Sequence, residues 1–182
     1  MLTQAEKQYF VQEQARHEAG YLAGATPQEQ SGFQRDAQAW KRYRRPIVDP
    51  IHKAGTFLDI GCANGLLMDD VATWTREDGH GVEVYGLDIS EALVELARQQ
   101  FPHLSRRVFV GNALLWDPPS RFDFVRTELV YVPAPLRRRY VERLLSRFVA
   151  SDGKLIICSY GSSRPEGSRA ALLIDVIQSW GF

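Results

Sequence analysis

The chain has 182 residues, a formal net charge of zero and a hydrophobic fraction of 45%. This length predicts one domain with a proper core, and the balanced charge provides no global attraction to nucleic acid or to an anionic membrane. Two cysteines are too few for a disulfide framework, and the four histidines are too scattered to suggest a metal site. The chain shows no signal-peptide pattern and no membrane-spanning apolar run, so we expect a cytoplasmic protein.

Residues 1–53 are expected to form a mostly helical segment ahead of the main domain. The stretch 19–32 is rich in Gly, Ala and small polar residues, which predicts a loop. Pro46 is expected to kink or divide the helix that follows this loop. The segment has two interpretations: packing on the sheet edge, or a lid over a ligand crevice. The side chains at helical spacing are Phe33, Ala37, Trp40, Arg44 and Ile47.

From Ala54 onward, short β-type runs alternate with helical patterns, which predicts a doubly wound α/β domain over 54–182. In the last helix before the final strand, we expect an apolar face opposite a row of arginines. The expected strands are 56–60, 82–88, 107–110, 122–127 and 154–160. The expected helices are 66–74, 91–101, 135–149 and 168–180. The expected apolar face consists of Leu136, Tyr140, Leu144 and Phe148.

The first strand of the α/β domain runs into a glycine turn, FLDIGCANGLL. Gly61 and Gly65 allow a sharp turn and a close approach to a ligand. Asp88 follows Gly65 by 23 residues, near the spacing at which a carboxylate accepts hydrogen bonds from ribose hydroxyls. The loop is not G-x-G-x-x-G, and Asp59 before it would repel a pyrophosphate but suit an ammonium. The pattern predicts a ligand with a ribose and a cationic or zwitterionic tail.

Five motifs in this order make the chain resemble class I S-adenosylmethionine-dependent methyltransferases over about residues 56–160. The resemblance implies a Rossmann-like methyltransferase fold with strand order 3-2-1-4-5, S-adenosyl-L-methionine as cofactor and S-adenosyl-L-homocysteine as product. The motifs are LDIGCANG (58–65), GLDIS (86–90), GNA (111–113), FDFVRTELVYV (122–132) and GKLIICSY (153–160).

The resemblance also implies a role for particular residues. Asp88 would hold both ribose hydroxyls, and Glu128 with the following Leu129 would lie beneath the sulfonium. Asn112 departs from the Asp that the family usually has there, and its amide both accepts and donates hydrogen bonds. The methionine part would be held by Asp59, Gly61, Cys62 and Gly65, and the adenine by Ile89, Asn112 and Ala113.

Several of these residues also have a purely structural interpretation. Asp88 could cap a strand end, Cys62 could fill a small buried space, and Tyr131 could belong to the core. Glu128 could be a structural carboxylate instead of lining the substrate site. The run Arg137–Arg139 is interpreted as a solvated helix face in preference to a nucleic-acid patch.

The expected function is methyl transfer to a small-molecule acceptor. The protein would orient the acceptor and exclude water, and a base is needed only if the acceptor holds its proton at pH 7. Glu128 and Tyr131 are the candidate catalytic residues. The alternatives are a catalytically silent or truncated binding protein of this fold and, disfavoured by the missing third glycine, an NAD(P)-binding oxidoreductase. The candidate lid residues are Tyr9, His17 and Tyr21.

The stretch Asp117–Ser120 reads DPPS, which is similar to the Asp-Pro-Pro-aromatic tetrapeptide of enzymes that methylate base amino groups. That tetrapeptide ends the fourth strand, whereas here the strand 122–127 follows it. Ser120 also cannot stack on a flipped base. We therefore interpret the stretch as a stiff turn and expect no nucleic-acid partner.

The end of the predicted sheet raises a separate expectation. The family's sheet commonly finishes with a sixth and an antiparallel seventh strand, which the residues after 160 do not supply. The strand 154–160 would then be an exposed apolar edge. This predicts either self-association through that edge or a truncated form of a longer enzyme.

Overall fold

The computed structural model describes residues 2–160 and 166–182, with side chains described for 2–160 and 173–182. Within them, five strands form one sheet in the order β3-β2-β1-β4-β5, and every neighbouring pair is parallel. The predicted doubly wound parallel sheet and its strand order are therefore confirmed. The strands are β1 (Gly55–Ile60), β2 (Val82–Asp88), β3 (Val108–Val110), β4 (Phe122–Glu128) and β5 (Val149–Cys158).

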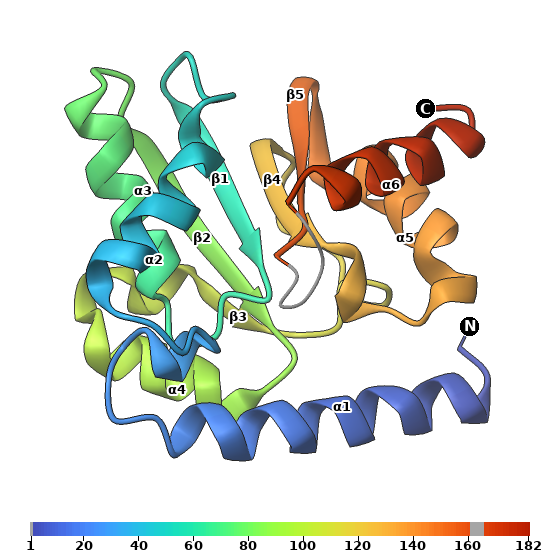
Figure 1. The fold of residues 1–182 in the computed structure, drawn as a ribbon, viewed down its shortest axis with the longest axis horizontal. Helices are drawn as coiled ribbons and strands as arrows, with labels where there is room; N and C mark the ends of the chain where they lie inside the picture. The colour runs from blue at the N-terminus through green and yellow to red at the C-terminus, as the bar shows by residue number, and fades with distance from the viewer. Residues whose placement is uncertain (1, 161–165) are drawn as a thin grey trace.

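Helices cover both faces of the sheet, and a long helix crosses beneath it. In Figure 1, α2, α3 and α4 lie on one side of the sheet and α5 and α6 on the other, while α1 runs across the end at which the arrows of β1 and β2 point. The helices are α1 (Gln4–Leu22), α2 (Ala37–Arg44), α3 (Leu66–Glu77), α4 (Glu91–Gln100), α5 (Arg137–Arg143) and α6 (Glu166–Ser179). Short 3-10 turns at η1 (Glu29–Ser31), η2 (Arg45–Val48), η3 (Pro102–Arg107), η4 (Leu129–Tyr131) and η5 (Ala134–Leu136), and a π turn at η6 (Leu144–Phe148), complete the set.

Helix α1 extends into the stretch that was predicted to be a loop. It begins with a capping box, in which Thr3 Oγ1 accepts from the Glu6 backbone N–H and Glu6 Oε2 accepts from the Thr3 N–H. It then continues to Leu22, so the loop prediction is wrong for residues 19–22. A helix forms there despite the small residues because its last turn contacts a later part of the chain. The ring of Tyr21 lies against Gly32.

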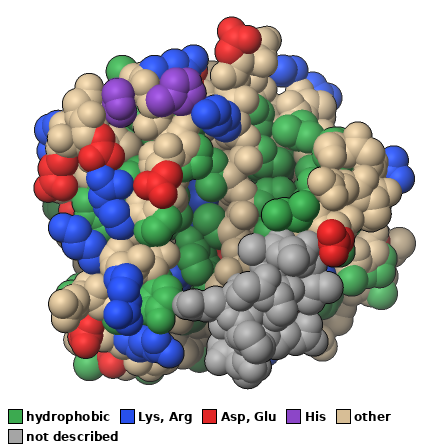
Figure 2. Space-filling model, turned by 45° about the horizontal axis from the view of Figure 1, so that its top comes forward, with side chains coloured by type: hydrophobic (Ala, Val, Ile, Leu, Met, Phe, Trp, Pro, Cys, Tyr) green, Lys and Arg blue, Asp and Glu red, His purple; other side chains and the backbone are tan. Residues whose placement is uncertain are grey.

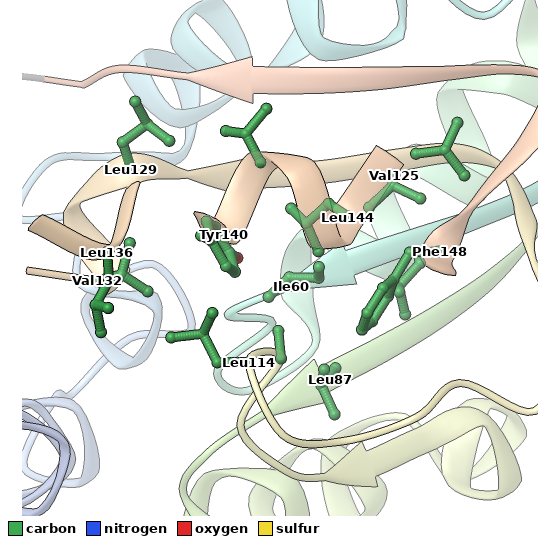
Figure 3. Packing of buried hydrophobic residues seen from close by; sticks show 14 of the residues in the cluster. Ile60, Leu87, Leu114, Val125, Leu129, Val132, Leu136, Tyr140, Leu144 and Phe148 are labelled. Atoms are coloured by element: carbon green, nitrogen blue, oxygen red, sulfur yellow. The ribbon is translucent and has the colours of Figure 1, made fainter. Parts of the chain in front are cut away.

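The apolar face predicted for residues 135–149 forms the centre of one core. Leu136, Tyr140, Leu144 and Phe148 are all at most 6% exposed. Figure 3 shows Tyr140, Leu144 and Phe148 directed toward Ile60 and Leu87 at the carboxyl ends of β1 and β2, and toward Leu114 in the loop after β3. The Tyr140 and Thr127 hydroxyls lie 2.6 Å apart, which anchors the end of β4 just before Glu128.

A second core lies on the opposite face of the sheet, under α2, α3 and α4. Trp40 belongs to it and donates from its indole nitrogen to Asp70 Oδ2 of α3 at 2.6 Å. This bond holds α2 against α3. Pro46 lies in the 3-10 turn η2 that follows α2, so the helix is divided as expected.

The surface carries charges of both signs. On the face that Figure 2 shows, basic and acidic side chains are interspersed, with hydrophobic side chains between them. Within residues 2–160 and 166–182, no helix combines the length and the hydropathy that crossing a membrane requires.

Candidate functional site

A cavity of about 320 Å³ lies at the carboxyl ends of the strands, which is within the size range of small-molecule sites. Its walls come from the ends of β1, β2 and β4, from the loop after β3, and from the N-terminal segment. Ligands of open parallel sheets bind at this edge because the loops there diverge at the point where the winding reverses. Among the described residues, no group of three or more His, Cys, Asp or Glu side chains is placed to hold a metal ion.

Asp88 lies on the cavity wall at the end of β2 and joins two loops. Its Oδ2 accepts from the Ala63 backbone N–H at 2.9 Å, and its Oδ1 accepts from the Ser90 N–H at 2.9 Å. Ser90 in turn caps α4, because its Oγ accepts from the Leu93 N–H at 3.1 Å. Burial raises the pKa of Asp88, while these backbone hydrogen bonds act in the opposite direction. Asp88 thus supports the loops and also faces the cavity.

Gly61 occupies the turn after β1 in a conformation that favours glycine, with φ of 79°. A Cβ atom there would lie 2.5 Å from Cζ of Tyr131. Gly61 therefore serves both the turn and the close approach of the Tyr131 ring. Both residues line the cavity.

A buried arginine connects the candidate catalytic residues. Arg126 of β4 is 3% exposed, and its Nη1 donates to Asp59 Oδ1 at 3.1 Å and to the Tyr131 hydroxyl at 3.0 Å. Its Nη2 donates to Glu128 Oε1. The Tyr131 hydroxyl also donates to Glu128 Oε1, at 2.9 Å. One guanidinium thus holds Asp59, Glu128 and Tyr131 together.

The electrostatics of this cluster follow from its burial. Burial raises the pKa of Asp59 to about 6, although the neighbouring Arg126 acts to lower it. Burial also raises the pKa of Tyr131 well above its usual range, so the phenol keeps its proton at neutral pH. Burial alone would lower the pKa of Arg126, but its acidic neighbours raise it well above the usual value, so this residue stays charged.

Arg126 was not identified as a site residue from the sequence. It lay within an expected strand, and the available signal was the single cation in the strand sequence FDFVRTE. In the parallel register Asp59 of β1 lies directly beside it. A buried charge requires a partner, so this pairing could have been inferred once β1 and β4 were known to be neighbours.

The adenine-contact candidates Ile89, Asn112 and Ala113 all line the cavity. Asn112 Oδ1 accepts from the Leu114 backbone N–H at 2.9 Å. This bond fixes the orientation of the side chain. The Asn112 amide nitrogen makes no hydrogen bond within the described part of the chain, and it can donate to a ligand.

The remaining candidates for the glycine loop lie behind the cavity wall. Asp59, Cys62 and Gly65 are not among the lining residues. Cys62 is 3% exposed and packs against Gly86, and burial raises the pKa of its thiol well above the usual value. Gly65 is the N-cap of α3 and faces Ala97. These three residues are positioned to shape the loop from behind.

Helix α1 forms the wall of the cavity that faces the strands. Of the three candidate lid residues, His17 and Tyr21 line the cavity and Tyr9 does not. Glu18 Oε2 accepts from Ser90 Oγ at 2.6 Å, which ties α1 to the cap of α4. The helix is therefore attached to the same loop that Asp88 supports.

The stretch Asp117–Ser120 lies away from this site and contributes no lining residue. Asp117 is exposed and accepts from Arg143 Nη2 at 2.8 Å. The chain enters β4 only afterwards, at Phe122, as the interpretation of a turn requires.

Comparisons with known proteins agree with this architecture. Residues 57–153 match a family model described as a methyltransferase domain. The PH0226 protein of Pyrococcus horikoshii is similar, with 27% identity over 66% of this chain and 56% of that one, at a TM-score of 0.53. Phosphoethanolamine N-methyltransferase 1 of Haemonchus contortus, solved with phosphoethanolamine and S-adenosylhomocysteine, is 18% identical over 90% of this chain, at a TM-score of 0.62.

The chain spans only 35% of that nematode methyltransferase and little more than half of the Pyrococcus protein. The [4+2]-cyclase SpnF also has this fold, at 17% identity over 97% of this chain and 71% of that one, with a TM-score of 0.61. No match was found among curated proteins. Because such distant structures share only the fold, the reaction must be argued from the site.

Proposed function

The chain belongs to the methyltransferase domain family, as its resemblance to class I S-adenosylmethionine-dependent methyltransferases predicts, and from this membership we propose that it methylates a small-molecule acceptor. The observation that carries the proposal is the position of Asp88 on the cavity wall beside the glycine turn at Gly61. A carboxylate at the end of the second strand is suited to ribose hydroxyls. Helix α1 lines the cavity, whose volume of about 320 Å³ suits small molecules.

The residues present fit an adenosyl cofactor. Asp88 would accept from the ribose hydroxyls, and Ile89 would supply an apolar surface for the adenine. The unused amide nitrogen of Asn112 would donate to an adenine ring nitrogen. Gly61 would leave room for the methionine part, and Asp59, Cys62 and Gly65 would shape that loop without touching the cavity.

When bound, S-adenosylmethionine supplies an activated methyl group on a sulfonium. The chain's own contribution is then to orient the acceptor, exclude water and receive a proton where the acceptor must lose one. Glu128 is suited to the last task because both of its hydrogen bonds, from Arg126 and Tyr131, use Oε1. No described residue bonds to Oε2, which can accept a proton from an acceptor in the cavity.

Tyr131 has a positioning role in this proposal. Its hydroxyl accepts from Arg126 and donates to Glu128, so the carboxylate is held in one orientation. Because burial keeps the phenol protonated, Tyr131 is not itself a base at neutral pH. Helix α1, which lines the cavity, would help to keep water from the acceptor.

Calorimetry with two ligands tests the proposal. We expect S-adenosylhomocysteine to bind with one site per chain and NAD not to bind, because the glycine turn lacks the third glycine of the dinucleotide-binding loop. Tight binding of NAD would favour the oxidoreductase alternative. Absence of binding at millimolar S-adenosylhomocysteine would remove the basis for methyl transfer.

A further inference from the structure

Arg44 is a buried cation without an anionic partner. It ends α2, is 8% exposed and lines the cavity. Within the described part of the chain it makes no ion pair and donates no hydrogen bond. Its surroundings are aromatic instead: the guanidinium carbon lies 3.6 Å from the ring centroid of Tyr160 and 5.0 Å from that of Trp40. A guanidinium has five N–H donors, and because those of Arg44 bond to no described residue and the side chain lines the cavity, they can donate to an anion that binds there.

None of the carboxylates at the site forms an ion pair with Arg44, and each bonds to other groups. Asp59 and Glu128 both accept from Arg126, the other buried arginine of the site. Asp88 accepts from two backbone N–H groups. The two buried arginines therefore differ: Arg126 is neutralised by its own chain, and Arg44 has no such partner among the described residues.

Tyr160 provides a second donor without a partner at the same place. Its hydroxyl is buried and has no hydrogen bond to any described residue, and the side chain lines the cavity. Its ring packs on Arg44 and has Arg126 at 5.6 Å. Tyr160 follows β5, whereas Asp88 ends β2, so two strands, β1 and β4, separate them in the sheet.

We propose that Arg44 and Tyr160 form a carboxylate-binding subsite at the β5 end of the cavity. One planar guanidinium matches one carboxylate in charge and in the spacing of its two donors, and the phenol adds a third. The rings of Phe33, Trp40 and Tyr160 surround the Arg44 guanidinium, whose carbon lies 5.2, 5.0 and 3.6 Å from their centroids. This inference rests on the proposed function in that it takes the cavity to be a small-molecule site. The carboxylate has two sources: the amino-acid end of the cofactor, or an acidic acceptor.

The first experiment measures the affinity of S-adenosylhomocysteine and of its decarboxylated analogue, which keeps the ammonium. The variants are Arg44→Met, which removes the charge, and Tyr160→Phe, which removes only the unpartnered hydroxyl. If the cofactor supplies the carboxylate, Arg44→Met weakens S-adenosylhomocysteine binding about 10- to 100-fold and leaves the analogue within about twofold. Tyr160→Phe also weakens S-adenosylhomocysteine binding and leaves the affinity for the analogue unchanged, but the loss is smaller than for Arg44→Met. Because the Tyr160 hydroxyl bonds to no described residue, this variant keeps the test decisive if Arg44→Met does not fold.

The second experiment measures benzoate binding to the protein loaded with S-adenosylhomocysteine. If the acceptor supplies the carboxylate, both variants leave S-adenosylhomocysteine affinity unchanged and abolish benzoate binding. Arg45→Met is the matched control, because Arg45 bonds to Asp78 at 2.5 Å and lies outside the cavity lining. It should change neither affinity.

Two results would overturn the subsite. One is unchanged affinity of both variants for both S-adenosylhomocysteine and benzoate; the other is an equal loss for the acid and for its decarboxylated analogue. Failure of the unmodified protein to bind S-adenosylhomocysteine would instead overturn the proposed function. Benzoate titration of the ligand-free protein and its variants would then decide on the subsite alone.

Discussion

Asp88 has two tasks, which a matched pair of substitutions can separate. It supports two loops through backbone hydrogen bonds, and it is proposed to hold the ribose. Asp88→Asn should weaken S-adenosylhomocysteine binding at least about tenfold, because an amide nitrogen replaces one acceptor oxygen. Calorimetry measures the loss. An unchanged affinity would place the ribose elsewhere.

Asp123 is the matched control for this change. It also accepts from a backbone N–H, that of Thr56 at 2.8 Å, but it lies at the start of β4, away from the cavity. Asp123→Asn should therefore lower stability and leave the affinity for S-adenosylhomocysteine unchanged.

Arg126 should contribute more to stability than any exposed arginine of the chain. Arg126→Met leaves Asp59 and Glu128 buried without their cation, which should lower the free energy of unfolding by about 3–5 kcal/mol. Arg138→Met is the control, since Arg138 forms only an exposed pair with Glu142 and should cost less than about 1 kcal/mol. Urea denaturation compares them, and equal effects would contradict the structural role of Arg126.

Asp59 should make stability depend on pH in an unusual direction. Its pKa is about 6 in the folded chain, above the usual value of 3.8, so the folded state binds this proton more tightly than the unfolded state. Its contribution is therefore complete below pH 4 and is lost as the pH rises through 6, by about 3 kcal/mol. The difference in unfolding free energy between the unmodified protein and Asp59→Asn, measured from pH 4 to 7, isolates this contribution. A difference that does not fall with pH would contradict it.

Helix α1 is the element through which the N-terminal segment reaches the site. Its capping box at Thr3 starts the helix, and Glu18 ties it to α4. Thr3→Ala should destabilise α1 by about 1 kcal/mol. Hydrogen exchange should then speed up in α1 about fivefold and stay unchanged in α3, whose N-cap is Gly65. Equal acceleration in both helices would show that α1 does not open by itself.

The elements were predicted where local pattern and burial coincide. The strands 56–60 and 82–88 were found because β-type apolar residues occupy buried positions there. The start of β5, Val149–Gly153, was not found, because Ser151 and Asp152 interrupt the β-type pattern and only Val149 of this stretch pairs with β4, at an irregularity of the register. Residues 19–22 were predicted as a loop but are helical. This end of α1 is stabilised by contacts distant in sequence, from Tyr21 to Gly32 and from Glu18 to Ser90.

The candidate site could be predicted only in part, because some of its residues are placed by contacts that are distant in sequence. Motif order predicted that Asp88, Gly61 and Asn112 would lie at one edge of the sheet, and all three line the cavity. Their contacts with a cofactor stay a prediction. The partners of Arg126 and the position of Arg44 depend on strand register and on the packing of α2, which no local pattern specifies.

At the scale of the whole molecule, β5 is an edge strand of the sheet. Leu155 and Ile157 on it are only partly buried, and the backbone groups on its outer side have no neighbouring strand among the described residues. Self-association through this edge stays a prediction. Light scattering over a range of concentrations should show a mass that rises with concentration, and a constant monomer mass would contradict edge pairing.

The central claim is that an adenosyl cofactor occupies the cavity between α1 and the carboxyl ends of the strands. A crystal structure of the complex with S-adenosylhomocysteine tests it most directly. We predict that the ribose hydroxyls contact Asp88, that the adenine packs on Ile89 and that the sulfur lies beside Gly61 and Glu128. A ligand bound anywhere else, with this cavity holding only water, would contradict the account.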